Sequence, residues 1–199
     1  MKFRGSVICL LALVLAVCAT RASGAGSSAG DGAWQAYMDA AALADVEGRL
    51  EDAERSLLAA LREVEKPGGA RMRLAFNVEA LAELYHRAGR RDDAEAFYLR
   101  SVELWEELLG PAQPRIGIPI HNLAVLNLED CQVDEALPLI ARVMKLWERT
   151  LRADHPDRVA AIRSEANGLR RCGRDDEATE LESRLKPPSE SATGTVARD

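Results

Sequence analysis

The sequence predicts an all-α fold, a solenoid of about four helix-turn-helix repeats. Long stretches between the glycines and prolines are rich in Ala, Leu, Glu and Arg, which favour helices, and β-branched runs are scarce. Apolar residues recur at helical spacing within those stretches. Similar segments return about every 42 residues, which indicates a repeat architecture.

The first residues of the chain differ from the rest. Lys2 and Arg4 precede the uncharged apolar stretch 7–19, which is followed by the small-residue segment 22–29. This order is typical of a secretory signal peptide, which we expect in residues 1–25. Three small residues could end the signal: Ala19, Ala22 and Ala25. We therefore expect an exported protein, either periplasmic or secreted.

The apolar stretch is short for a membrane span. Thirteen helical residues cover about 20 Å, whereas the hydrocarbon core of a bilayer is about 30 Å thick. Retention as a membrane anchor is the alternative interpretation. Val17 stands where a bacterial lipoprotein signal has a small residue, so we do not expect a lipid anchor at Cys18.

Net charge argues against two classes of partner. The chain carries a net charge of −6 at pH 7, and removal of the signal would take away Lys2, Arg4 and Arg21 but no acidic residue. Such a surface repels the phosphates of nucleic acids and of anionic membranes. We expect a protein or peptide partner, no nucleic acid, and no membrane once the signal is cleaved.

The repeat keeps its register over most of the remaining chain. Residues 89–94 (GRRDDA) align with 48–53 (GRLEDA) and with 173–178 (GRDDEA). In the copy that lies between residues 89–94 and 173–178, Cys131 stands in the glycine position and Ala136 ends the motif. The expected repeat domain is 33–186, with copies one to four at about 34–69, 75–114, 117–156 and 159–186.

Copy two illustrates why each copy should form two helices. Leu81 and Tyr85 lie one turn apart on an apolar face, and Gly89 tolerates the positive φ that ends a helix. Asp92 or Asp93 is expected to cap the second helix. The second helix would turn these side chains inward: Ala94, Phe97, Tyr98, Ser101, Leu104, Trp105 and Leu108.

These residues resemble the tetratricopeptide repeat family. The pattern is carried by Leu81, Ala82, Tyr85, Gly89, Ala94 and Tyr98. The repeat period and the linkers 109–114 and 154–157 resemble the long variant found in kinesin light chains. The resemblance covers roughly residues 34–186. It implies a right-handed solenoid whose first helices line a concave groove that receives a peptide or a protein segment.

Copy four departs from this pattern. Glu165 and Gly168 replace leucines, and Glu182 replaces an aromatic residue. We expect this copy to be a polar cap with a solvated outer face, because repeat arrays need polar ends. Residues 187–199 have no periodicity and few apolar residues, so we expect a disordered tail.

The resemblance also implies which residues line the groove. These are Glu79, Glu83, His86 and Arg87 in copy two, Ile118, His121, Val125 and Leu128 in copy three, and Arg163, Asn167 and Arg170 in copy four. The groove would run from acidic to basic, with Ile118, Val125 and Leu128 as an apolar anchor site. In the alternative interpretation these are ordinary solvated helix faces, and Glu79 and Glu83 form an exposed acidic stripe.

The sequence carries no recognisable signal of catalysis or metal binding. It contains no glycine-rich phosphate loop and no nucleophile elbow. None of the three histidines has a His, Cys or Asp one helical turn away. We expect no enzymatic activity, no cofactor and no metal. The function predicted is an interaction scaffold; the alternatives are an accessory subunit that uses its convex face or edges, and an enzyme with an unrecognised site.

Two cysteines lie outside the expected signal. Cys131 and Cys172 both fall in the turn between the helices of consecutive copies. A disulfide needs Cα atoms within about 7 Å, whereas packed helices lie about 8–10 Å apart, so a bridge would require the turns to adapt. Export would place both thiols in an oxidising compartment. Two interpretations stay open: a Cys131–Cys172 disulfide and two unpaired buried thiols.

Overall fold

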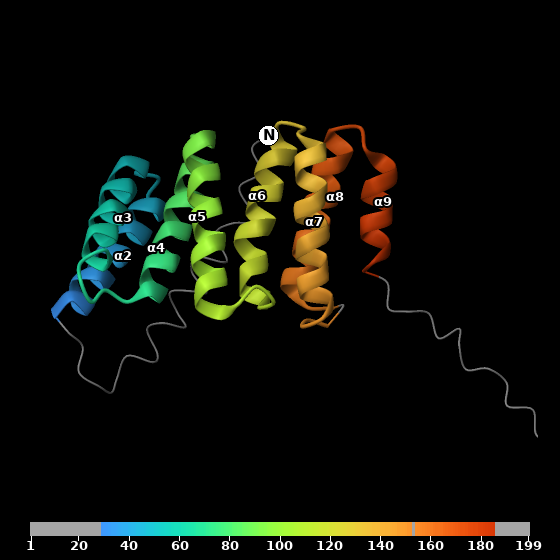
Figure 1. The fold of residues 1–199 in the computed structure, drawn as a ribbon. Coiled ribbons are helices and arrows are strands. Elements are labelled where there is room, and N and C mark those ends of the chain that lie inside the picture. The colour runs from blue at the N-terminus through green and yellow to red at the C-terminus, as the bar shows by residue number, and fades with distance from the viewer. Residues whose placement is uncertain (1–28, 153, 186–199) are drawn as a thin grey trace, which may run out of the picture. The chain divides into compact units, whose positions relative to one another are not determined.

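A computed structural model describes residues 29–152 and 154–185, in which helices are joined by turns and short loops and no strand occurs (Figure 1). The expected signal peptide and tail lie outside these residues. The helices are α2 (Ala29–Val46), α3 (Leu50–Val64), α4 (Arg71–Arg87), α5 (Arg91–Leu109), the 3-10 helix η1 (Pro114–Ile116), α6 (Gly117–Glu129), α7 (Val133–Glu148), α8 (Pro156–Arg171) and α9 (Asp175–Ser183). The prediction of an all-α fold is confirmed.

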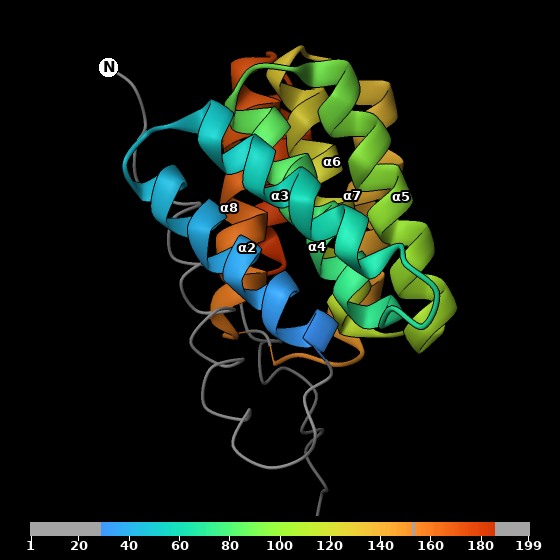
Figure 2. The ribbon, with the colours of Figure 1, turned by 90° about the vertical axis from the view of Figure 1, so that its left-hand side faces the viewer.

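The helices form four consecutive pairs, one for each copy of the repeat. They divide into two compact units, unit 1 (Met1–Leu84) and unit 2 (Tyr85–Asp199), with the boundary inside α4. In unit 1, α2 and α3 pack side by side (Figure 2). In unit 2, α6 packs against α5, α7 and α8, and α8 packs against α9.

The same turn joins the two helices of every copy. In copy two, the Gly89 amide donates to the carbonyl of His86 at 3.0 Å and the Arg90 amide donates to the carbonyl of Tyr85 at 2.9 Å. This pair of bonds is a Schellman motif, which needs a left-handed residue at its first position. The other copies repeat both bonds, and the left-handed residues are Gly48, Gly89, Cys131 and Gly173.

A small residue follows each turn at a fixed distance. Ala53, Ala94, Ala136 and Ala178 are each at most 1% exposed, and their amides form the first backbone bond of the second helix. A larger side chain at these buried positions would push the paired helices apart. The recurring alanine of the sequence motif is therefore a packing requirement.

Asp92 and Asp93 do not cap α5, contrary to expectation. The N-cap residue is Arg90, and its side chain makes no capping bond. Because Arg90 already completes the Schellman turn, both aspartates fall in the first turn of α5, where their charge favours the helix dipole. Asp93 forms an ion pair with Arg90 at 2.7 Å.

The start of α6 is fixed by an aromatic contact inside unit 2. The indole nitrogen of Trp147 donates to the Pro114 carbonyl at 2.9 Å, and the ring is almost fully buried. A Cβ added at Gly117 would overlap this ring. Glycine at this position therefore lets the first turn of α6 lie directly on Trp147 of α7.

Candidate functional site

The first helix of copy three, α6, carries three residues of the predicted groove at its surface. Ile118, His121 and Val125 recur at i, i+3 and i+7, and all three are half-buried. The two apolar side chains therefore flank the imidazole along one half-buried strip of the helix. An apolar group of a ligand could contact this strip without any rearrangement of the core.

The neighbouring first helix, α8, presents polar side chains at the matching positions. Arg163 and Asn167 lie one helical turn apart, both are exposed, and neither forms a hydrogen bond or ion pair with another described residue. Arg170 is held differently: its guanidinium donates two bonds, 2.7 and 2.6 Å long, to the Glu182 carboxylate. The hydrogen bond from Arg170 lowers the pKa of Glu182, and the charge of Arg163 adds to that effect.

A buried carboxylate of α8 contacts a histidine of α6. Glu165 of α8 is 0% exposed, and its Oε1 lies 2.8 Å from Nδ1 of His121. Its second oxygen, Oε2, has no hydrogen-bond partner in the described part of the chain. This contact fixes the imidazole of His121 between the two first helices.

A second histidine–glutamate pair links the first helices of copies two and three. Nε2 of His86 lies 2.9 Å from Oε2 of Glu129, and Nδ1 lies 3.3 Å from the Tyr98 hydroxyl. The hydrogen bond to His86 lowers the pKa of Glu129, with smaller contributions from the charges of His86, Arg171 and Arg91, while burial opposes the shift. Arg87, the next predicted groove residue, is exposed.

Three of the predicted groove residues are buried. Glu79 and Glu83 of unit 1 are 5% and 9% exposed, so the exposed acidic stripe is wrong. Both belong to α4, in which residues 81–85 are all buried, because an inner helix of a repeat array is covered on more than one side. Leu128 is 1% exposed and cannot serve as an anchor. A Cβ added at Gly168 would lie 2.9 Å from the Leu128 Cβ, so the leucine fills the space beside that glycine.

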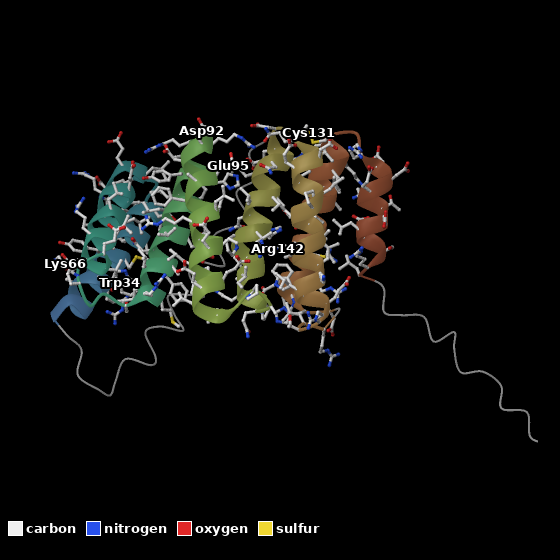
Figure 3. All side chains as sticks on the ribbon, viewed as in Figure 1. Trp34, Lys66, Asp92, Glu95, Cys131 and Arg142 are labelled. Carbon is white, nitrogen blue, oxygen red and sulfur yellow. A yellow bond between two sulfur atoms is a disulfide. The ribbon has the colours of Figure 1, made fainter. Side chains whose placement is uncertain are left out.

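Cys131 and Cys172 form a disulfide, with their Cα atoms 5.3 Å apart (Figure 3). Cys131 is exposed and has φ 55°, the left-handed conformation that glycine adopts in the other copies. The two turns are therefore close enough to be bridged. Each cysteine lies in the loop that follows the first helix of its copy. The bond ties copy four to copy three within unit 2.

The role of Glu165 is not evident from the repeat pattern alone. This residue was expected on a solvated polar cap, yet it is among the most deeply buried side chains of unit 2. The available signal was its position, since a carboxylate at a leucine position of the repeat needs a partner, and His121 lies one copy earlier. Copy four therefore has a polar side chain in its interior as well as on its surface.

The described residues contain neither a cluster of metal ligands nor a membrane-spanning helix. No group of three or more His, Cys, Asp or Glu side chains there could hold a metal ion. No helix in the described ranges is both long enough and apolar enough to cross a membrane.

Comparison with known families and structures agrees with the repeat pattern. Models of the tetratricopeptide repeat match residues 71–137 and 120–157, which are parts of copies two and three. BtubC (BKLC) from P. vanneervenii is 19% identical over 96% of this chain and 81% of its own, with a TM-score of 0.70. The nearly identical TPR-like repeats of a candidate kinesin light chain from Podosopora anserina are 23% identical over 89% of this chain and 83% of their own, with a TM-score of 0.63.

No curated protein matches this chain. The solved structures share its fold, an α-solenoid built from helix pairs, and the family models match the copies in which the motif is clearest. The Schellman turn and buried alanine recur in all four copies. Residues 71–157 therefore match the tetratricopeptide repeat, and the helix pairs on either side share its turn and its buried alanine.

Proposed function

We propose that this chain is an exported scaffold that binds an extended segment of a partner protein on the first helices α6 and α8. Tetratricopeptide repeats act generally as protein–protein interaction modules, and the match of residues 71–157 to that repeat supports this broad class. The proposal adds a location for the binding surface, a chemistry for the bound segment and a compartment.

The observation that carries the proposal is the contrast between α6 and α8 in unit 2. Ile118 and Val125 offer apolar contacts on α6, whereas Arg163 and Asn167 on α8 are exposed and make no bonds to described residues. A hydrogen-bond donor without an existing partner costs less free energy to bind than a donor that must first break an ion pair. A segment with an apolar side chain followed by Asp or Glu would satisfy both helices.

Two observations support export. Residues 1–25 have the composition of a secretory signal, and the disulfide between Cys131 and Cys172 is typical of proteins in oxidising compartments. The compartment can be tested by sequencing the N-terminus of the protein purified from its native source. A mature chain that begins near residue 26 and contains the disulfide is expected, and one that still begins at Met1 would contradict export.

The binding surface is tested by affinity capture from the native envelope or secretome. The bait is the chain from residue 26, which contains every described residue, and the variant is Arg163→Gln/Asn167→Ala. Both replaced side chains are exposed, so circular dichroism should show an unchanged fold. We expect a partner that the parent retains and the variant loses.

The control for this experiment is Leu99→Gln, which replaces an exposed apolar residue of α5 away from the proposed surface. Capture should survive this change. If the partner is retained by Arg163→Gln/Asn167→Ala but lost with the control, binding occurs elsewhere and the accessory-subunit alternative is favoured. Glu79 and Glu83 are unsuitable for the test because both are buried.

A further inference from the structure

Copy one exposes three positions that every other described copy buries. The exposed residues are Ala36, Ala40 and Leu43 of α2, and Leu43 is 58% exposed. The repeat register aligns them with Asn77, Leu81 and Leu84, with Pro119, Leu123 and Leu126, and with Ala161, Glu165 and Gly168, all of which are buried. Among the described helices, no preceding copy packs on this α2 face.

The inner copies show what kind of element fits these positions. In unit 1, the Asn77 side chain, which corresponds to Ala36, donates to the Leu57 carbonyl of α3 at 3.2 Å. In unit 2, both helices of copy three pack against α8. The face is thus one on which the helices of a preceding copy pack. Figure 2 views unit 1 from the side of α2, whose outer face no other helix of that unit covers.

The last helix provides a contrast. The exposed residues of α9 are polar: Asp175, Asp176, Thr179, Glu180 and Ser183. A polar outer helix is how repeat arrays end in water. The outer face of α2 instead offers Ala36, Ala40 and Leu43, with Val46 80% exposed at its end. The exposed face of α9 is therefore polar, whereas the outer face of α2 is partly apolar and is suited to packing against another helix.

We propose that the face formed by Ala36, Asp39, Ala40 and Leu43, the α2 face, docks a basic amphipathic helix of another protein. The two alanines leave room for a close helix–helix approach, and Leu43 supplies the apolar contact. No Lys or Arg occurs in Ala29–Val46, and Asp39 is exposed on this face, whereas Glu47, which follows the helix, already pairs with Arg49. A stripe of Lys or Arg beside the apolar residues of the docked helix would complement the Asp39 carboxylate.

Charge also decides against a second copy of this chain as the occupant. An antiparallel pair of α2 helices centred on Ala40 would bring two Asp39 side chains together without any base on either helix. Like charges at such an interface oppose association. The proposal concerns a surface separate from α6 and α8, so the two can be tested independently.

The test uses two labelled peptides derived from α3, the helix of the preceding copy that bonds to the equivalent position of α4. One peptide has the native sequence 49–65, and the other carries Glu51→Lys, Glu54→Lys and Glu63→Lys. Fluorescence anisotropy measures their binding to the chain from residue 26. The two peptides have the same length and the same apolar residues, and circular dichroism of both corrects the comparison for the effect of the lysines on helix formation. We expect the lysine-rich peptide to bind at least about tenfold more tightly.

Protein variants locate the binding. Leu43→Gln should abolish binding of the lysine-rich peptide, Asp39→Asn should weaken it, and the control Leu99→Gln should leave it unchanged. The variant Arg163→Gln/Asn167→Ala should also leave it unchanged, which separates this result from the fate of the proposed function. Equal binding by the parent and Leu43→Gln, or no binding of either peptide, would overturn the proposal. A parent dimer that Leu43→Gln converts to a monomer in sedimentation velocity would also overturn it, in favour of a second copy.

Discussion

Two junctions inside unit 2 join the same kinds of helices by different chemistry. Copies two and three meet at the middle junction, where the Arg91 guanidinium donates to the Leu126 carbonyl at 2.6 Å and pairs with Asp130 at 3.0 Å. Exposed and half-buried side chains make these contacts. Copies three and four meet at the terminal junction, where the Cys131–Cys172 disulfide and the contact of the buried Glu165 with His121 join them.

The difference reflects what each copy can bury. The second helix of copy two contributes Tyr98 and Trp105 to the core, whereas α9, the second helix of copy four, contributes Ala178 and Leu181 and is only 9 residues long. A second helix with so few buried apolar side chains gains little free energy from packing. The terminal junction is therefore held by a covalent bond and by a buried polar contact, and its stability should depend on a few atoms.

The largest expected effect is the loss of the disulfide. The bridge closes a loop with a sequence separation of 41 residues, and loop-closure entropy gives about 4 kcal/mol for a loop of that length. Cys172→Ser should lower the free energy of unfolding of unit 2 by up to about that amount, as measured by urea denaturation. Hydrogen exchange should speed up in α8 and α9 while α5 stays protected.

Reduction of the parent protein is the matched control for this change. Under a reductant, the parent should unfold at the same urea concentration as Cys172→Ser, and the variant should not respond. If the oxidised and reduced parent unfold together, the terminal junction does not depend on the disulfide and the comparison between junctions fails.

The second effect concerns the buried carboxylate. Glu165→Ala removes a fully buried side chain and leaves the His121 nitrogen without its acceptor, which should cost about 3 kcal/mol. Glu165→Leu restores the residue type of the repeat pattern and fills the volume, so it should be milder than alanine. Urea denaturation of both variants decides the point. Alanine and leucine variants of equal stability would mean that volume does not matter here, and if both were as stable as the parent, the carboxylate would not matter either.

The third effect separates the strain at Cys131 from its covalent bond. Cys131→Gly and Cys131→Ser both remove the disulfide, but glycine adopts φ 55° without the penalty of about 1 kcal/mol that a side chain brings. The glycine variant should therefore be the more stable of the two by about 1 kcal/mol. Thermal unfolding of the two variants provides the measurement. A serine variant as stable as the glycine variant would show that the turn holds no such strain.

Much of the fold could be predicted from the sequence because the repeat encodes it locally. The spacing of Gly48, Gly89 and Gly173 predicts where helices end, since the left-handed position of a Schellman turn favours glycine. Local patterns could not decide which faces are covered by neighbouring helices. That is why Glu79 and Leu128 were expected in the groove although both are buried.

The pairing of the two cysteines also could not be predicted from local sequence patterns. The sequence placed Cys131 and Cys172 in equivalent turns of consecutive copies, but helix spacing alone left their pairing open. The bridge forms with a Cα separation of 5.3 Å, which depends on how closely the two turns approach. Such distances follow from packing between copies, for example of Leu128 beside Gly168, and are not written in any single copy.

The smallest expected effect concerns the His86–Glu129 pair at the middle junction. The hydrogen bond from His86 holds the pKa of Glu129 below its ordinary value of about 4.5, so the pair stabilises the folded state above that pH. As pH falls from about 4.5 through the lower folded pKa, Glu129 takes up a proton and this contribution is lost. Because the Glu129 side chain is 45% exposed, solvent screens the pair and the loss should stay below about 1 kcal/mol.

The measurement for this pair is a titration of the Glu129 carboxyl carbon by NMR in the parent and in His86→Gln. The pKa of Glu129 should be higher in the variant, because the largest cause of its depression has been removed. Arg171 and Arg91 remain and keep part of the shift. An unchanged pKa would mean that His86 does not hold the carboxylate. A loss of stability as large as that of Cys172→Ser would mean that the middle junction also depends on one contact, and the distinction between the junctions would fail.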